Sequence, residues 1–546
     1  MRGRTPMKVA VVGTAAIAMF AAGCTQAPET PPTSTGGELR TNSGEPESLL
    51  PTNSGESEGI AVIRELYTTL VEFDPQTGDP VMAVAESIES TDNKTWTIKI
   101  KDGWTFHNGE RVTADSFINA WNFGAYGPNT QGNSYFYDRI AGYADLQSGE
   151  DPDGDGPQEP PAPKADKMSG LKKVDDLTFT VELTEPFAGW PVVLGYSAFA
   201  PMAEACLADI DACNEKPIGN GPFMMDGAWE HKVQIKLVKY EDYAGTPASI
   251  DRLTFRIYDN ADTALLDLQA GELDLIDFVP PARMPEVRQQ YGDRFIEDPT
   301  SALTYVGLPL YVDALKDKRI RQALSLAVDR QAIIDAVFEG ARIPAGSLAP
   351  DLIIGGGRTD ACDYCTYDPD RAKQLLAEAG GWPAGQKLTY WFNAGAGHDQ
   401  WMQGVADSIK EVLGIDYELN GSLQFAEYLA TGDEKEFTGP FRLGWLADYP
   451  LLENYLKPLF GSQGSSNYPG YNNPQFDQLI SQGDNAPSVQ EAVQFYQQAE
   501  DIVMEDMPII PMWWGKSTVL LGDTVESITI NKIHGIDFAT AVMRQS

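Results

Sequence analysis

The chain has 546 residues, of which 42% are hydrophobic and 22% charged, and this composition is typical of a folded globular protein. The length excludes a small domain held together mainly by disulfides. Acidic residues outnumber basic residues by 79 to 40, so the formal net charge is −39. Because this charge repels phosphate backbones, we expect no nucleic-acid partner, and we attribute the acidity to solubility rather than to binding of cationic solutes.

The first residues have the pattern of an export signal. Basic residues precede an apolar run over residues 9–22, which is too short to span a membrane and fits the core of a signal peptide. The run ends in FAAGC, which resembles a bacterial lipobox although alanine stands where leucine is more common. We predict a signal peptide over residues 1–23, a lipid on Cys24 and a tether over residues 24–37. A soluble secreted protein is the alternative.

Hydrophobic periodicity then predicts alternating strands and helices. Apolar residues alternate with polar ones at 95–100, 177–183, 232–238 and 253–257, which predicts half-buried strands. Helical spacing and capping residues predict helices over 320–328, from Asp329 to Gly340, from Asp368 to Gly380, and after Ser488. The interleaving of strands and helices indicates mixed α/β domains.

Apart from Cys24, the cysteines fall into two local pairs, Cys206 with Cys213 and Cys362 with Cys365. An even number in an exported protein favours disulfides, and we predict one within each pair. A zinc site at the second pair needs two more ligands, and the four histidines show no paired metal spacing.

Residues 151–156 read DPDGDG, the opening of a calcium-binding loop, but alanine occupies the twelfth position, where a bidentate Glu is required. We therefore interpret this segment as a solvated acidic excursion, with an ordered calcium site as the alternative. We expect no metal and no cofactor.

Several sequence motifs of common enzymes are absent. The chain has no P-loop, no G-x-G-x-x-G after a strand and no H-E-x-x-H. Its many carboxylates leave an acid pair possible by count alone. We nevertheless expect a protein that is not an enzyme.

Several strings together resemble one family, the peptide and nickel class of solute-binding proteins that serve bacterial ABC importers, and they are most similar to oligopeptide-binding proteins. The strings are EPESLLP (45–51), RELYTTL (64–70), residues 95–117, GNGPF (219–223), AGELDLID (270–277), residues 319–340, YDPDRAKQLLAEAG (367–380), GWLADYP (444–450) and MPIIPMWW (507–514). Each match is weak alone, but the strings occur in the family's order and together extend over most of the chain.

This resemblance implies a two-lobed α/β fold, like that of periplasmic binding proteins, with an extra subdomain and a ligand cleft between the lobes. Lobe I would comprise residues 38–67, 203–304 and 515–546, the extra subdomain residues 68–202, and lobe II residues 305–514. Two crossing strands would join the lobes. We expect a monomer.

The resemblance also implies four ligand-binding residues. Asp448 matches the family aspartate that pairs with a peptide's N-terminal ammonium, with a surface carboxylate as the alternative. Arg442 matches an arginine that meets a ligand carboxylate, with a structural ion pair as an equal alternative. Tyr135 and Phe425 fall near aromatic residues of the ligand groove, although ordinary core packing is the stronger interpretation for both.

Two segments depart from the family pattern. LTYVGLPLYVDALKDKR, residues 303–319, replaces an Asn-containing strand and short loop, and Leu451, Leu452 and Glu453 replace a second Asp-Pro after GWLADYP. Both flank the expected cleft, so they bear on the identity of the ligand more than on the fold.

The leading hypothesis is a lipid-anchored receptor at the extracytoplasmic face of the bacterial membrane, which captures oligopeptides and delivers them to the permease subunits of an ABC transporter. The alternative is the same fold and transport role with a non-peptide ligand, such as an oligosaccharide, an opine or a metal chelate. An anchored enzyme and a signalling or chaperone module are more remote possibilities.

Overall fold

The computed structural model describes residues 36–148, 162–394 and 397–544. The predicted lipid site Cys24 and the DPDGDG segment lie outside these ranges. Within them, no helix is long and apolar enough to cross a membrane, and no group of three or more acidic, histidine or cysteine side chains could hold a metal ion.

The main sheet has eleven strands, in the order β15-β14-β16-β12-β17-β11-β1-β10-β9-β8, with β13 paired to β17. Its strands are β1 (Glu38–Ser43), β8 (Phe223–Met225), β9 (Gln234–Lys239), β10 (Arg252–Ile257), β11 (Leu275–Ile276), β12 (Phe295–Gly307), β13 (Arg342–Pro344), β14 (Leu388–Trp391), β15 (Tyr417–Asn420), β16 (Phe441–Trp445) and β17 (Ile509–Leu521). Parallel and antiparallel pairs occur in the same sheet.

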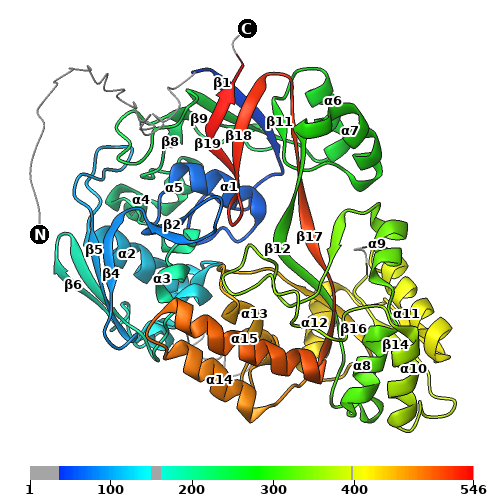
Figure 1. Cartoon of the computed structure of the whole chain (residues 1–546). Coiled ribbons are helices and arrows are strands. Elements are labelled where there is room, and N and C mark those ends of the chain that lie inside the picture. Colours follow the sequence, from blue (N-terminus) through cyan, green and yellow to red (C-terminus); the bar gives the residue numbers. More distant parts are fainter. Residues whose placement is uncertain (1–35, 149–161, 395–396, 545–546) are drawn as a thin grey trace, which may run out of the picture. The chain divides into compact units, whose positions relative to one another are not determined.

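The two long strands β12 and β17 pair antiparallel and connect two groups of strands (Figure 1). Residues 295–299 of β12 lie beside residues 516–520 of β17, next to β11 and β1. After an irregularity in the register, residues 303–307 of β12 lie between β17 and β16. Each long strand therefore belongs to one group at one end and to the other group at its other end.

A separate sheet has the order β4-β5-β7-β6, and two hairpins, β2-β3 and β18-β19, stand apart from both sheets. The strands are β2 (Val71–Phe73), β3 (Pro80–Met82), β4 (Ala85–Glu89), β5 (Thr95–Ile100), β6 (Leu171–Asp175), β7 (Thr178–Glu182), β18 (Val525–Asn531) and β19 (Gly535–Met543). The predicted strand at 95–100 matches β5. The predicted strand at 232–238 begins two residues too early, because Val233 lies in the turn before β9 and is 55% exposed.

The described α-helices are α1 (Ser57–Leu66), α2 (Ala114–Ala125), α3 (Trp190–Val193), α4 (Glu204–Ala208), α5 (Ile210–Glu215), α6 (Ala261–Gln269), α7 (Met284–Tyr291), α8 (Lys318–Leu326), α9 (Arg330–Phe338), α10 (Pro369–Glu378), α11 (Asp399–Leu413), α12 (Phe425–Asp433), α13 (Glu453–Phe460), α14 (Pro474–Asp484) and α15 (Val489–Asp506). The predicted caps are confirmed, since the side chains of Asp329, Asp368 and Ser488 accept from backbone amides of α9, α10 and α15. At the end of α9, Gly340 adopts the left-handed conformation that ends a helix.

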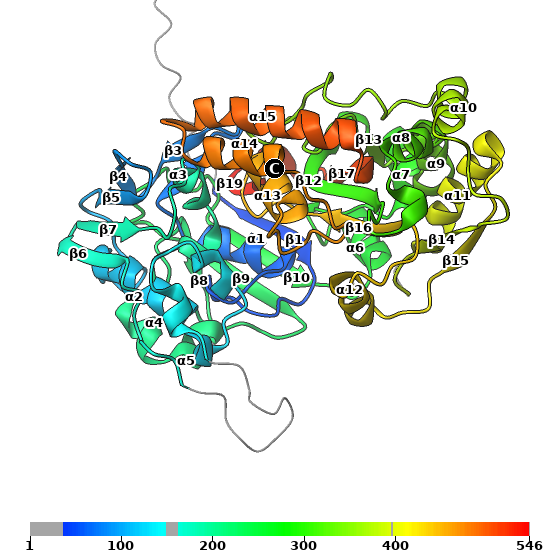
Figure 2. The same ribbon diagram turned by 90° about the horizontal axis from the view of Figure 1, so that it is seen from below.

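The largest hydrophobic core joins two segments that are far apart in the sequence. It contains Phe117 and Trp121 of α2 together with Tyr455 of α13 and Tyr496 of α15. Figure 2 shows α13, α14 and α15 grouped together. Because these side chains share one buried core, the helices near the C-terminus are tied by apolar packing to the sheet of β4 to β7 and its helix α2.

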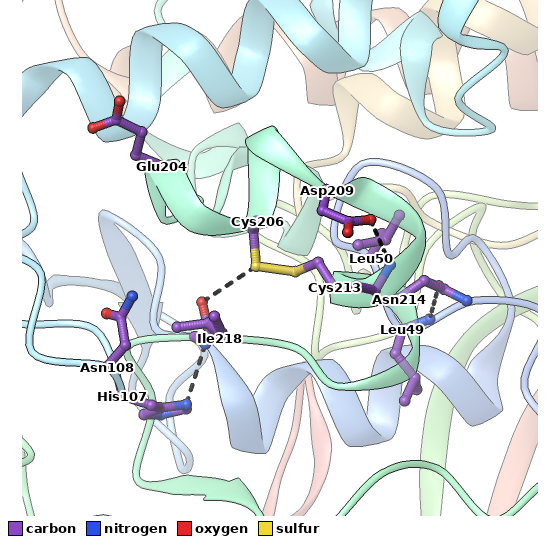
Figure 3. The surroundings of a disulfide bond; sticks show 12 residues. Leu49, Leu50, His107, Asn108, Glu204, Cys206, Asp209, Cys213, Asn214 and Ile218 are labelled. Carbon is purple, nitrogen blue, oxygen red and sulfur yellow. Dashed lines mark hydrogen bonds between the residues drawn. A yellow bond between two sulfur atoms is a disulfide. The ribbon is translucent and has the colours of Figure 1, made fainter.

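The cysteines lie in the two predicted pairs. Cys206 of α4 lies at bonding distance from Cys213 of α5 (Figure 3), and Cys362 lies at bonding distance from Cys365. Each pair closes a short local loop. Whether these bonds form in the cell stays a prediction.

Candidate functional site

Asp448 lies in the loop between β16 and α13 and faces a small pocket of about 50 Å³. One wall of this pocket comes from the same loop, from Ser301 and from Leu352 and Ile353. The remaining lining comes from α1, from β2, from the segment before η4 (Ser197–Phe199) and from the β18-β19 hairpin, with the side chains Arg64, Phe73, Tyr196, Ile533 and His534. Segments from both strand groups therefore enclose the site.

The carboxylate of Asp448 is held by two side chains. Asn454 Nδ2 donates to Oδ2 at 3.1 Å, and the hydroxyl of Tyr135 donates to Oδ1 at 3.5 Å. Burial raises the pKa of Asp448, while these two bonds lower it and the neighbouring Glu453 raises it. In the described part of the chain, no basic side chain lies within ion-pair distance of Asp448. A partly buried carboxylate without a cation is suited to bind one.

Arg64 on α1 faces the same pocket. Its Nη1 donates to the carbonyl oxygen of His534 at 2.5 Å, and this is its one hydrogen bond within the described ranges. Burial lowers the pKa of Arg64. Because a guanidinium has five N–H donors, Arg64 has donors left for a ligand. Arg64 lies in the RELYTTL string (64–70), and no role for it was predicted from the sequence. The sequence feature that could have indicated a role is a basic residue between the buried positions Ile63 and Leu66 of an amphipathic helix.

Arg442 lies on β16, six residues before Asp448. Its Nη1 donates to Asn393 Oδ1 at 3.1 Å, and its buried Nε has no partner. No carboxylate within the described ranges forms an ion pair with it, so the alternative of a structural ion pair is not observed. Burial lowers the pKa of Arg442. It lies near His398, whose pKa is lowered to about 4 by burial and by this guanidinium.

Between these two charges the chain offers free backbone groups. β16 pairs with β12, and after its end the side chain of Leu446 is 62% exposed. Among the described residues, the amides and carbonyls of Leu446 and Ala447 have no backbone partner. Unpaired groups of this kind can bind an extended peptide by strand addition. Six residues span at most about 20 Å, which limits the length of chain that could bridge both charges.

The two aromatic candidates differ in position. Tyr135, in the short helix η2 (Ser134–Tyr137), bonds to Asp448, stacks on Phe136 and remains 52% exposed. Phe425 begins α12 and is 48% exposed, and none of its described contacts joins it to Asp448, Arg442 or Tyr135. The expectation of core packing is therefore wrong for both, because both rings are half exposed. The structure brings Tyr135, but not Phe425, to Asp448.

Comparisons with known proteins show the family of the chain. The family described as bacterial extracellular solute-binding proteins, family 5 middle, matches residues 79–467. The oligopeptide-binding protein OppA of Bacillus subtilis is 26% identical over 522 residues, covering 92% of this chain and 91% of the relative. The dipeptide-binding protein of Escherichia coli is 28% identical, with 82% and 83% covered, and the heme-binding protein A of Haemophilus influenzae is 28% identical, with 82% and 81% covered.

Solved structures show the same fold. The unliganded open form of the periplasmic murein tripeptide-binding protein MppA matches with a TM-score of 0.82 and 24% identity, over 95% of this chain and 99% of that one. Haemophilus influenzae OppA in complex with RPPGFSPFR matches with a TM-score of 0.68 and 22% identity, over 94% and 100%. These matches confirm the predicted two-lobed α/β fold.

Proposed function

Because the chain belongs to family 5 of the bacterial extracellular solute-binding proteins, a class of transport components that are not enzymes, we propose that it captures oligopeptides between its lobes and delivers them to an ABC permease. The observation that carries this proposal is the carboxylate of Asp448, which Asn454 and Tyr135 orient and which has no basic partner among the residues that the structure describes. A peptide's α-ammonium would supply the missing charge and hydrogen-bond donors. Relatives named for oligopeptide and dipeptide binding support this ligand class.

Arg442 is proposed to bind the ligand's carboxylate at the other end of the site. Its unpartnered Nε and the absence of an ion pair within the described ranges support this role. The reach of at most about 20 Å from Asp448 corresponds to at most about six peptide residues at about 3.3 Å each. The free backbone of Leu446 and Ala447 would pair with the peptide main chain, and the exposed ring of Phe425 is proposed to contact its side chains.

Peptide binding in this site requires the lobes to separate. A pocket of about 50 Å³ holds only a few water molecules, since each needs on the order of 10–15 Å³. We propose the division given by the sequence, with lobe I at 38–67, 203–304 and 515–546, the extra subdomain at 68–202 and lobe II at 305–514. Strands β12 and β17 would then act as the hinge between lobe I and lobe II.

A non-peptide ligand is the second candidate, because matched relatives include a heme-binding protein and a probable deoxycholate-binding protein. Native mass spectrometry of the purified chain would identify a carried ligand. Calorimetry with trialanine, tetraalanine and pentaalanine would then test peptides that differ in length but not in side chain. We expect dissociation constants in the micromolar range or below. These correspond to a favourable binding free energy of about 8 kcal/mol or more. A carried non-peptide together with no heat from any of the three peptides would contradict peptide capture.

We propose that Cys24 carries the lipid anchor and that the monomeric protein is held at the extracytoplasmic face. The FAAGC string supports this, because small residues before a cysteine follow a short apolar run. Cys24→Ala should release the protein from the membrane fraction, whereas full retention of the variant would contradict the anchor.

We propose that the two local disulfides form in this oxidising compartment. Both pairs lie at bonding distance, which supports their formation. Peptide mapping without reductant should recover Cys206 with Cys213 and Cys362 with Cys365. Free thiols or pairing between the two regions would contradict the proposal.

A further inference from the structure

The loop that carries Asp448 is contacted by one short segment of the region around α2, residues 134–139. Tyr135 reaches the carboxylate of Asp448 at 3.5 Å. Four residues later, Arg139 Nη2 donates to Oε1 of Glu453 at 2.9 Å. One segment of six residues thus contacts the loop at both of its ends, at Asp448 and at Glu453.

Glu453 is one of the residues at which the chain departs from its family's pattern. It is fully buried, and besides Arg139 it accepts a bond of 2.5 Å from the hydroxyl of Tyr449. Arg139 also lies over the ring of Phe187, with its guanidinium carbon 4.0 Å from the ring centroid. A buried carboxylate is costly unless it is paired and hydrogen-bonded. Glu453 therefore strongly favours the arrangement in which the 134–139 segment lies against the loop.

Asn454 connects this pair to the ligand-binding carboxylate. It is 2% exposed, and its Oδ1 accepts the backbone N–H of Asp448 at 2.9 Å and Nε1 of Trp445 at 3.1 Å. Its Nδ2 donates to Asp448 Oδ2 at 3.1 Å. One buried amide thus fixes the backbone of Asp448 and the orientation of its carboxylate.

The geometry points to Asn454 and the Arg139–Glu453 pair as positioning residues that determine specificity for a free α-ammonium. Asn454 orients the carboxylate of Asp448, and the ion pair holds Tyr135 against it, so that the site is formed before the ligand arrives. Preorganisation of this kind strengthens binding by lowering the cost of ordering side chains. The inference rests on the proposed function, because it assumes that Asp448 receives the ligand's ammonium.

The test compares two probes, trialanine and N-acetyl-trialanine, by calorimetry on the full chain. The ratio of their dissociation constants measures selectivity for the free ammonium. We expect a ratio of about 30 or more in the wild type. Arg139→Met and Glu453→Gln should each lower this ratio by about tenfold. The two losses should be similar because both residues belong to one network. Arg111→Met, which breaks the exposed pair with Asp102 in the same region, is the control and should leave the ratio unchanged.

The two variants separate positioning from simple electrostatics. Removing the positive charge of Arg139 strengthens the local field that attracts an ammonium, and removing the negative charge of Glu453 weakens it. Electrostatics alone would move the ratio in opposite directions, whereas loss of positioning lowers it in both. Opposite shifts, or an unchanged ratio in folded variants, would overturn the inference and leave the proposed function intact.

If a single variant fails to fold, the inference can be tested with the double variant that carries both Arg139→Met and Glu453→Met. Replacing both partners removes the unpaired buried charge and is often nearly neutral for stability. We expect this variant to fold and to show the lowered ratio, and a wild-type ratio in it would overturn the inference. A ratio near one in the wild type itself would contradict the role proposed for Asp448, and the inference with it.

Discussion

The two charged ends of the proposed ligand site differ in how firmly they are held. At one end, the carboxylate of Asp448 is bonded by Asn454 and Tyr135, and its backbone amide is bonded by Asn454 as well. At the other end, among the residues that the structure describes, the side chain of Arg442 makes one hydrogen bond, to Asn393, and its buried Nε has no partner.

This difference fits what each end is proposed to bind. Every unmodified peptide presents its α-ammonium in the same chemical form, so a rigid site can bind it with little loss of conformational freedom. The position of the carboxylate changes with peptide length, and a loosely held guanidinium can follow it. We therefore expect the Asp448 end to supply most of the selectivity and the Arg442 end to tolerate variation.

The largest effect is expected from Asp448→Asn. This change keeps the shape of the side chain but removes the charge that pairs with the ammonium. Breaking one side of a buried ion pair costs about 2–5 kcal/mol, so calorimetry should show trialanine binding weakened by about 30-fold or more. The melting temperature of the empty protein should change little. A loss below threefold would show that the ammonium is bound elsewhere.

A smaller effect that depends on peptide length is expected from Arg442→Met. The loosely held guanidinium should contribute about 1–1.4 kcal/mol, or roughly tenfold in affinity, and only for peptides whose carboxylate reaches it. Titration with trialanine, tetraalanine and pentaalanine should therefore give unequal losses. Equal losses near 30-fold for all three lengths would contradict the idea that this end is adaptable.

On acidification, peptide binding through Asp448 should weaken before binding through Arg442. Burial raises the pKa of Asp448 above its usual value, so on lowering the pH this carboxylate gains a proton earlier than an exposed aspartate at about 3.9. The Arg442 guanidinium stays charged throughout. The affinity for trialanine should therefore begin to fall at a higher pH than an exposed aspartate would cause, and Asp448→Asn should lose this dependence. An equal dependence in the variant would assign the titration to another group.

The smallest effect concerns stability and not binding, and it supplies a control for the pH experiments. Burial raises the pKa of Glu500 to about 7, despite its bonds to the amide of Leu348 and to Arg358. The folded state therefore keeps a proton that the unfolded state releases at about 4.3, so stability falls as the pH rises from about 4.3 to about 7 and levels off above that pH. Between pH 6.5 and 8 the loss from this group is roughly 1 kcal/mol or less.

Thermal melts of Glu500→Gln should show a flatter dependence over this range. His107 and His398 titrate below this range, because burial lowers the pKa of each to about 4. His231 and Glu72, whose pKa values are raised, are present in both proteins and do not enter the difference between them. Trialanine affinity of the variant should match the wild type. An unchanged pH dependence of melting would show that Glu500 does not bind the proton.

Local patterns in the sequence predicted much of the fold. Caps at Asp329, Asp368 and Ser488 are read from neighbouring residues, and the structure confirms them. Asp448 and Arg442 were proposed from the motif around GWLADYP, and their roles stay predictions. The pair of Arg139 and Glu453 is 314 positions apart in sequence, and no local pattern links such residues. In the sequence, the one indication was a glutamate directly after Leu451 and Leu452, at a position where we expected a departure from the family pattern.

The most direct test of the difference between the two ends uses the wild-type protein and chemically modified peptides. Tetraalanine, its N-acetyl form and its C-terminal amide should be titrated by calorimetry under one set of conditions. We predict that N-acetylation weakens binding by about 30-fold or more, whereas amidation weakens it by about tenfold or less. Equal losses from the two modifications, or a larger loss from amidation, would contradict the conclusion that the Asp448 end is the fixed and selective end of the site.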